Sequence, residues 1–262
     1  MSAAYHKCTP EIWGGIECSI NRVGNKFYDQ LAFARHYEHG EDDIACIASL
    51  GIKKLRYPVL WEYHKPYAHS QIDWRWTDVQ LNSIRSYGID AIAGLVHHGS
   101  GPAYTNLLDT NFPDKLASYA AEVAHHYPWI KYYTPVNEPL TTARFSGLYG
   151  FWYPHRRDDV SFVTMLFNQL KAVVYAMREI RRVNPNAKLI QTEDLGKTYS
   201  TPLLQYQADF ENHRRWLTYD LLCGKVDRYH PLWRYFIKLG IRERDILFFK
   251  ENVCVPDIAG FN

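Results

Sequence analysis

The sequence predicts an α/β protein of the (β/α)8 TIM-barrel type, incomplete, with six of the eight βα units. Short apolar runs alternate with longer segments of helical periodicity, which is the pattern of a parallel sheet. The repeat is roughly 40 residues long, and ~250 residues normally make eight such units. Neither a glycine-rich phosphate fingerprint nor a Walker motif follows any predicted strand, which removes the main support for a nucleotide-binding doubly wound sheet.

Six runs have the β-branched and aromatic content of buried strands. They cover residues 12–16, 53–57, 89–96, 130–136, 188–192 and 257–261. The last run lies at the C-terminal end of the sequence, and no linker or low-complexity stretch divides the chain. We therefore expect one barrel domain over residues 1–262, incomplete at its C-terminal side.

Four predicted helices have recognisable ends, because glycine and proline stop helices and aspartate starts them. They are residues 43–50 before Gly51, 74–87 between Asp73 and Gly88, 112–127 with Pro113 in the first turn, and 160–183 before Asn184 and Pro185. The longest carries an apolar stripe of helical spacing, which indicates that one face packs on a core.

The bulk composition argues against several classes of partner. With 30 basic and 28 acidic residues, the net charge of +2 gives no broad field for nucleic acid or an anionic membrane. The five cysteines are scattered and form no C-x-x-C pair, and no metal-ligand spacing is present, so we expect no metal or cofactor. No stretch is typical of a signal peptide or a membrane span. We expect a cytoplasmic protein that binds a small ligand.

Asn137-Glu138-Pro139 follows the predicted strand 130–136 directly. The proline ends the strand, so the carboxylate of Glu138 is expected where the strand gives way to a loop. In a barrel of parallel strands, reacting groups sit at that rim. Asparagine and glutamate beside proline are also ordinary turn residues, so the tripeptide needs support from the rest of the chain.

Several further motifs occur in a fixed order along the chain. They are Trp13-Gly14 with Gly24, Arg56-Tyr57-Pro58-Val59-Leu60-Trp61, Leu95-Val96-His97-His98, Asn137-Glu138-Pro139, the loop residues Gly147, Gly150 and Pro154, Asn168, and Asp257-Ile258-Ala259-Gly260-Phe261-Asn262. Together they resemble the family 1 glycoside hydrolases, which are retaining β-glycosidases on a (β/α)8 barrel. The chain looks most similar to a bacterial branch that can be fused to a nucleotide-sugar (dTDP-4-dehydrorhamnose) reductase.

This resemblance implies roles for particular residues. Glu138 would be the general acid/base, Asn137 would hold the sugar 2-hydroxyl, and Arg56 would lie beside the catalytic carboxylates. Substrate-binding residues would be Asn21, His97, Trp61 and Asn262. The implied ligand is a small carbohydrate or β-glycoside, hydrolysed with retention, and the implied partner is a fused or associated sugar-nucleotide reductase.

Two departures from the family pattern are visible. Asn21 stands where the family keeps a longer glutamine that binds sugar. The family nucleophile is a glutamate at the end of the seventh strand, whereas only six strands are predicted here. The resemblance therefore leads us to expect the nucleophile beyond residue 262, and to expect the 262-residue chain to be inactive alone.

Glycoside cleavage needs two carboxyl groups facing each other across the sugar. Glu193, followed by Asp194, closes the fifth predicted strand and is a candidate second carboxylate; the alternative is a structural pair that binds Arg56 or Lys197. Glu17 and Glu62 are weaker candidates near the same rim.

Arg56 would leave a buried strand, so we expect a carboxylate beside it. His97 and His98 are adjacent on a strand and should point to opposite faces, so only one should enter the barrel mouth, and we expect His97.

Two other interpretations remain open. The chain could be a non-hydrolytic carbohydrate-binding or scaffold domain attached to a sugar-nucleotide reductase, which the altered glutamine position and the acidic pair of the fifth strand favour. It could also be a six-unit protein that closes by forming a homodimer, because six strands leave open barrel edges.

Overall fold

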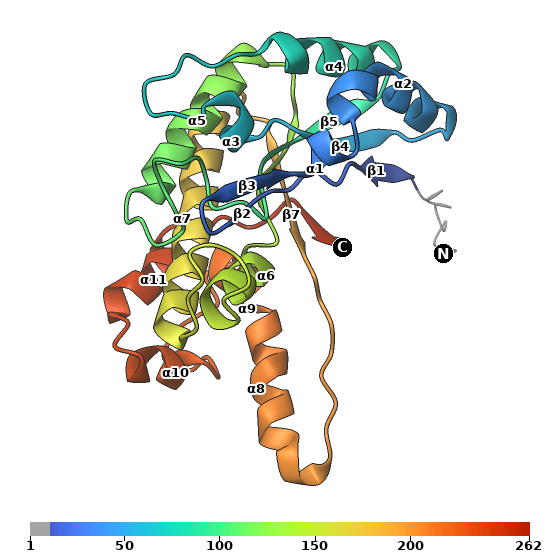
Figure 1. Ribbon diagram of the computed structural model, residues 1–262. Coiled ribbons are helices and arrows are strands. Elements are labelled where there is room, and N and C mark those ends of the chain that lie inside the picture. Colours follow the sequence, from blue (N-terminus) through green and yellow to red (C-terminus); the bar gives the residue numbers. More distant parts are fainter. Residues whose placement is uncertain (1–10) are drawn as a thin grey trace, which may run out of the picture.

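The computed structural model describes residues 11–262 and confirms the predicted fold class (Figure 1). Six parallel strands form one curved sheet, an incomplete barrel, in the order β1-β4-β5-β6-β7-β8. They are β1 (Trp13–Gly15), β4 (Lys54–Pro58), β5 (Asp90–His97), β6 (Tyr132–Asn137), β7 (Lys188–Glu193) and β8 (Ile258–Phe261). All six predicted strands are present, and each begins and ends within two residues of the prediction.

The four predicted helices are also present. They are α2 (His36–Ser49), α4 (Arg75–Ser86), α5 (Phe112–His126) and α7 (Asp159–Val183). Helix α2 begins earlier than predicted, because its polar first turns hide the periodicity. His36 is nevertheless buried, with Nδ1 2.6 Å from Asp43 Oδ2 and Nε2 2.8 Å from the Tyr57 hydroxyl.

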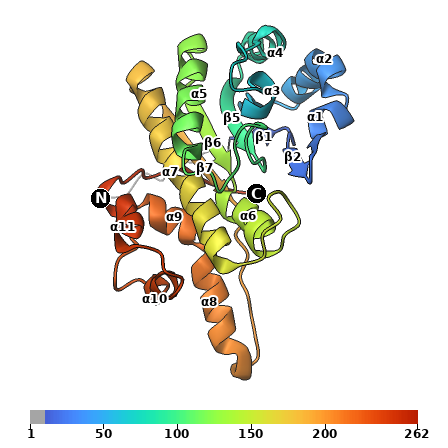
Figure 2. The ribbon, with the colours of Figure 1, turned by 60° about the vertical axis from the view of Figure 1, so that its left-hand side comes forward.

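Shorter elements were not predicted from the sequence. They are α1 (Gln30–Phe33), α3 (Trp61–His64), α6 (Pro139–Ala143), the π-helix η1 (Arg144–Leu148), the 3-10 helix η2 (Pro202–Leu204), α8 (Gln205–Arg215), α9 (Leu217–Leu222), α10 (Trp233–Lys238) and α11 (Glu243–Glu251). Helix α8 and the extended segment before it project from the body of the molecule (Figures 1 and 2).

Helix α7 is the central helix of the outer layer, and it runs beside α5 (Figure 2). Asp158 caps its first turn by accepting a hydrogen bond from the backbone N–H of Ser161 at 2.7 Å. Among the described residues, α7 alone has the length and apolar composition of a membrane span, but 72% of that apolar stretch is buried inside the fold. The apolar stripe is therefore explained by packing on the core.

A two-stranded antiparallel hairpin lies outside the main sheet and was not predicted. It consists of β2 (Ile20–Val23) and β3 (Lys26–Asp29), with Gly24 in the turn at φ +59°. The hairpin contacts loops at the carboxyl ends of the strands, because Asn21 Nδ2 donates to the carbonyl of His98 at 3.2 Å and Tyr153 N donates to the carbonyl of Arg22 at 2.9 Å.

The packing of η1 on α7 gives a first testable prediction. A Cβ added at Gly147 would lie 2.7 Å from Phe162 Cα, so Gly147→Ala must push η1 away from α7. We expect a loss of about 1–3 kcal/mol in the free energy of unfolding. The matched control is Gly196→Ala, because a Cβ there meets its nearest atom at 3.9 Å. Urea denaturation should show a change below about 0.5 kcal/mol in the free energy of unfolding of the control. Equal losses for the two substitutions would show that the close approach of η1 to α7 does not determine the stability.

Candidate active site

The candidate site lies at the carboxyl ends of four neighbouring parallel strands, and the long side chain of Arg56 reaches it from the middle of a fifth. Arg56 belongs to β4, His97 to β5, Asn137 to β6 and Thr192 to β7, and Asn262 directly follows β8. These ends meet at one rim of the sheet, because all neighbouring strands run parallel. Hydrogen bonds connect these residues into one group, called here the rim cluster.

Asn137 is the centre of the rim cluster, and its side chain is only 2% exposed. Its Oδ1 accepts hydrogen bonds from Arg56 Nη1 at 2.7 Å, from Thr192 Oγ1 at 2.7 Å and from Asn262 Nδ2 at 3.2 Å. Three donors around one oxygen leave it no further acceptor capacity. The amide orientation follows from these bonds, so a ligand of Asn137 would have to bind through Nδ2.

His97, the last residue of β5, and His98, which follows it, both lie beside Asn137, so the prediction that only His97 enters the barrel mouth is wrong. The Nε2 atoms of His97 and His98 are each 3.3 Å from Asn137 Nδ2. The strand ends at His97, and His98 has a left-handed backbone at φ +52°, so the alternation of side chains along a strand does not extend to it.

His98 is a neutral imidazole at this rim. Burial, with a smaller contribution from the charge of His97, lowers the pKa of His98 to about 3. Its Nδ1 lies 3.1 Å from Thr142 Oγ1. A neutral ring that donates from Nδ1 leaves Nε2 as an acceptor, so His98 can accept the amide hydrogen of Asn137.

Glu138 lies where the sequence predicts it, directly after β6, and is 7% exposed. Its backbone is left-handed, with φ +44° and ψ +61°, an uncommon conformation for glutamate. The backbone N–H donates to the Thr192 carbonyl at 3.2 Å, which holds this turn against β7. The side chain turns into the rim cluster: Asn262 Nδ2 donates to Oε1, and His98 Nε2 lies 3.7 Å from Oε2.

Arg56 does not have the carboxylate partner that its position led us to expect. Within residues 11–262 its hydrogen-bond acceptors are neutral: Asn137 Oδ1, Thr192 Oγ1 at 3.2 Å and Asn262 Oδ1 at 3.5 Å. Its Nε is buried without a partner in the same part of the chain. The guanidinium, Thr192 and Asn262 line a cavity of about 370 Å³ between β1 and β8. The cluster therefore presents a positive charge to this cavity.

Glu17 brings a carboxylate to the same rim. Its Oε1 lies 3.3 Å from His97 Nε2 and accepts a hydrogen bond from Ser19 Oγ at 2.8 Å. The hydrogen bond from His97 lowers the pKa of Glu17 to about 2, against the opposing effect of burial. Glu17, one of the weaker sequence candidates, is thus an anion joined to the cluster through His97.

Glu193 does not face Glu138 across an open space, so the structure does not support it as the second carboxylate. Its side chain is fully buried, and Oε1 accepts hydrogen bonds from the backbone N–H of Leu140 at 2.8 Å and from Thr218 Oγ1 at 2.5 Å. Thr192 takes the inward position next to it, as alternation along a strand requires. The alternative pairing with Arg56 or Lys197 is not observed either; Asp194 pairs with Arg215 at 3.2 Å.

Of the remaining predicted residues, Asn21 reaches the rim and Trp61 does not. Asn21 reaches the rim from β2, but its amide donates to the carbonyl of His98. The structure does not bring Trp61 to the cluster: its side chain is 1% exposed, and Nε1 donates to the hydroxyl of Tyr104 at 3.0 Å. Thr192 was missed, although its place one residue before Glu193 at a strand end could have identified it.

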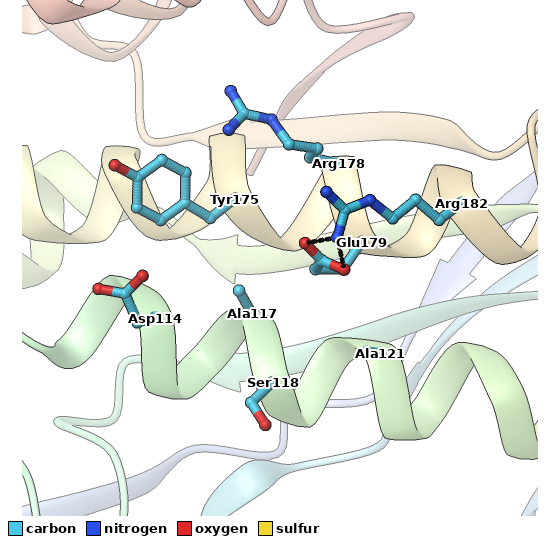
Figure 3. Close-up of a pocket in the computed structure, with 8 residues that line it drawn as sticks. All are labelled: Asp114, Ala117, Ser118, Ala121, Tyr175, Arg178, Glu179 and Arg182. Carbon is cyan, nitrogen blue, oxygen red and sulfur yellow. Dashed lines mark hydrogen bonds and ion pairs between the residues drawn. The ribbon is translucent and has the colours of Figure 1, made fainter.

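A separate hollow of about 430 Å³ lies between α5 and α7 (Figure 3). Small side chains such as Ala117 and Ala121 form its α5 wall, and Arg182 pairs with Glu179 on α7 at 2.6 Å. None of the rim cluster residues lines it. The chemistry of the cluster therefore concerns the cavity between β1 and β8.

Glu193 gives a prediction about pH and stability. Burial raises its pKa from the ordinary value of 4.5 to about 8, so the folded chain holds a proton that the unfolded chain loses at lower pH. Stability should therefore fall as the pH rises from about 4.5 to about 8. One pKa unit corresponds to about 1.4 kcal/mol, so the fall should amount to several kcal/mol. In Glu193→Gln, denaturant titrations between pH 5 and 8 should lack this component; parallel curves for both proteins would contradict the assignment.

Comparisons with known proteins agree with this architecture, although no family model matches the chain. Beta-glucosidase A of Thermotoga maritima is 23% identical over 186 residues, which cover 68% of this chain and 41% of that protein. A β-glucosidase structure from Thermotoga maritima in complex with galacto-hydroximolactam superposes with a TM-score of 0.76 at 19% identity, covering 87% of this chain and 54% of that one.

The AHE enzyme from Alicyclobacillus herbarius gives a TM-score of 0.74 at 17% identity, with the same coverage of 87% and 54%. The chain thus spans about half the length of these proteins. At these identities the likeness establishes the fold, and the chain has the (β/α)8 barrel architecture of these structures over six of its strands.

Proposed function

We propose that this chain is a β-glycosidase-like glycoside hydrolase domain in which Glu138 is the general acid/base. The observation that carries the proposal is the position of Glu138: a nearly buried carboxyl at the mouth of a parallel barrel, in contact with Asn262 and beside Asn137. The similarity to a β-glucosidase, and to β-glucosidase structures in complex with galacto-hydroximolactam or isofagomine lactam, supports a sugar as the ligand.

Asn137 would orient the sugar next to Glu138. Since Oδ1 already accepts three hydrogen bonds and His98 can accept one Nδ2 hydrogen, the other Nδ2 hydrogen would bind a sugar hydroxyl. Such a bond to the 2-hydroxyl strengthens as the sugar approaches an oxocarbenium ion. His97 and Asn21, which also lie at this rim, would contact further hydroxyls of the same ring.

Arg56 marks where we propose the second carboxylate lies. A partly buried guanidinium with only neutral partners favours an anion in the adjoining cavity. At roughly 5 Å from Glu138, a carboxylate there would act as a nucleophile. The sequence resemblance implies that this residue lies beyond position 262.

The proposed reaction has two steps. The nucleophilic oxygen bonds to sugar C1 while the bond from C1 to the leaving oxygen breaks, and that oxygen takes the proton of Glu138. In the second step Glu138 removes a proton from water, which attacks C1 and releases the carboxylate. Two inversions at C1 give net retention of configuration.

Three other predictions stay proposals based on sequence alone: a cytoplasmic location, a fused or associated sugar-nucleotide reductase, and a homodimer formed through the open edges of β1 and β8. The relatives and structures named above include no non-hydrolytic binding module, so these comparisons give the alternative of a binding or scaffold domain no support.

Chemical rescue, in which azide takes the place of the nucleophile, tests the role of Glu138 in the 262-residue chain. Azide should enter beside Arg56 and attack C1 of an aryl β-glucoside, forming a C1–N bond as the bond to the aryl oxygen breaks. For phenyl β-glucoside, whose basic leaving oxygen needs a proton, we expect Glu138→Gln to slow azide-dependent release of phenol by about 10²–10⁴-fold. For a dinitrophenyl glucoside, which leaves without protonation, the loss should be small.

The matched control is Glu38→Gln, on the exposed surface of α2, which should behave as the unchanged chain. Glycosyl azide of inverted configuration, identified by NMR, would confirm a direct displacement. Equal azide-dependent rates for Glu138→Gln and the unchanged chain, or no glycosyl azide from any of the substrates, would contradict the proposal.

A further inference from the structure

A third pocket, of about 320 Å³, lies beside the β2–β3 hairpin and is separate from the rim cluster. It is bounded by β3, by α3 and by the loop after β5. The side chains that matter here are Phe27, Asp29, Glu62, Tyr63 and Tyr67. Its volume lies at the lower end of the range for small-molecule sites.

Glu62 lines this pocket, and one oxygen of its carboxyl group lacks a hydrogen-bond partner within residues 11–262. It is 7% exposed, and Oε1 accepts a hydrogen bond from the backbone N–H of Gly101 at 3.0 Å. Its Oε2 is buried and has no hydrogen-bond partner in residues 11–262, and no ion pair to Glu62 occurs in that range. Burial raises the pKa of Glu62 to about 7. Buried carboxyl groups normally have both hydrogen bonds and a counter-ion, so this one has capacity for a donor.

The chain makes room for the Glu62 carboxyl. A Cβ added at Gly99 would lie 2.0 Å from Glu62 Oε1, so the loop can pass over the carboxyl only because residue 99 has no side chain. Gly101, at φ +78°, then directs its N–H at the same oxygen. The glutamate is therefore held in place by the backbone of one loop, while its other oxygen has no protein donor.

The other walls determine which ligand fits. Asp29 is a second carboxylate in the pocket; Oδ1 accepts from Leu31 N at 2.9 Å, and Oδ2 accepts from the hydroxyl of Tyr37 at 2.8 Å. Two acidic side chains disfavour phosphates, carboxylates and other anions. Phe27, Tyr63 and Tyr67 leave 40%, 37% and 71% of their area exposed, and aromatic faces of this kind attract organic cations as well as apolar groups.

We propose that this pocket binds a small primary amine, whose ammonium group donates to the Glu62 carboxyl while its apolar part packs on Phe27, Tyr63 and Tyr67. The ammonium supplies both the missing donor and the missing counter-ion. Neutral alcohols supply only a donor, and they should bind more weakly. This site is independent of the function proposed for the rim cluster.

Calorimetric titration of the chain with benzylamine and with benzyl alcohol tests the proposal, since the two probes have similar shape and differ in charge. We expect benzylamine to bind at least tenfold more tightly. Glu62→Gln should weaken the affinity for benzylamine at least tenfold and leave the affinity for benzyl alcohol unchanged. The matched control Glu38→Gln should change neither affinity. Equal affinities for the two probes, or no detectable binding of millimolar benzylamine, would overturn the proposal.

A second variant covers the case in which Glu62→Gln does not fold. Tyr67 is largely exposed, so Tyr67→Ala should leave the fold intact, as circular dichroism can show. It should weaken the affinity for benzylamine severalfold, because it removes one aromatic wall of the pocket. NMR shifts from benzylamine that map to Tyr63 and Tyr67 would support the site, and shifts confined to the rim cluster would exclude it.

Discussion

The carbonyl oxygen of the Asn137 side chain is the point on which the rest of the site depends. Its three donors come from β4, from β7 and from the residue after β8, so a single oxygen connects strand ends that are far apart in the sequence. These bonds determine which way the amide faces, because any rotation would break several of them at once. Glu138 follows in the chain, and its left-handed backbone then directs the carboxyl back into the same group of side chains.

One positive charge at the rim lacks a carboxylate partner within residues 11–262. Glu17 forms an ion pair or charged hydrogen bond with His97, and His98 is neutral, whereas Arg56 keeps a positive charge that no carboxylate among residues 11–262 neutralises. The cost of burying such a charge is offset only in part by neutral acceptors. The chain spans about half the length of the similar proteins, and the cavity between β1 and β8 lies beside Arg56.

Strands, long helices and the place of Glu138 could be predicted from the sequence, because each depends on local periodicity and on a proline or glycine that ends an element. The β2–β3 hairpin could not, since its residues are mostly exposed and lack an apolar alternation. The directions of the His98 and Trp61 side chains, which follow strand ends, could not be predicted either. Once the chain leaves the strand, a left-handed residue or a helical turn decides where the side chain points, and neither follows from the period of two.

A crystal structure of the chain soaked with isofagomine lactam, the ligand in one of the similar β-glucosidase structures, tests the central claim most directly. We predict that the sugar-like ring lies at the strand ends, with one hydroxyl accepting a hydrogen bond from Asn137 Nδ2 and with Glu138 within hydrogen-bond distance of the ring or its nitrogen. Density for the inhibitor elsewhere, with Asn137 and Glu138 untouched at the rim, would contradict it.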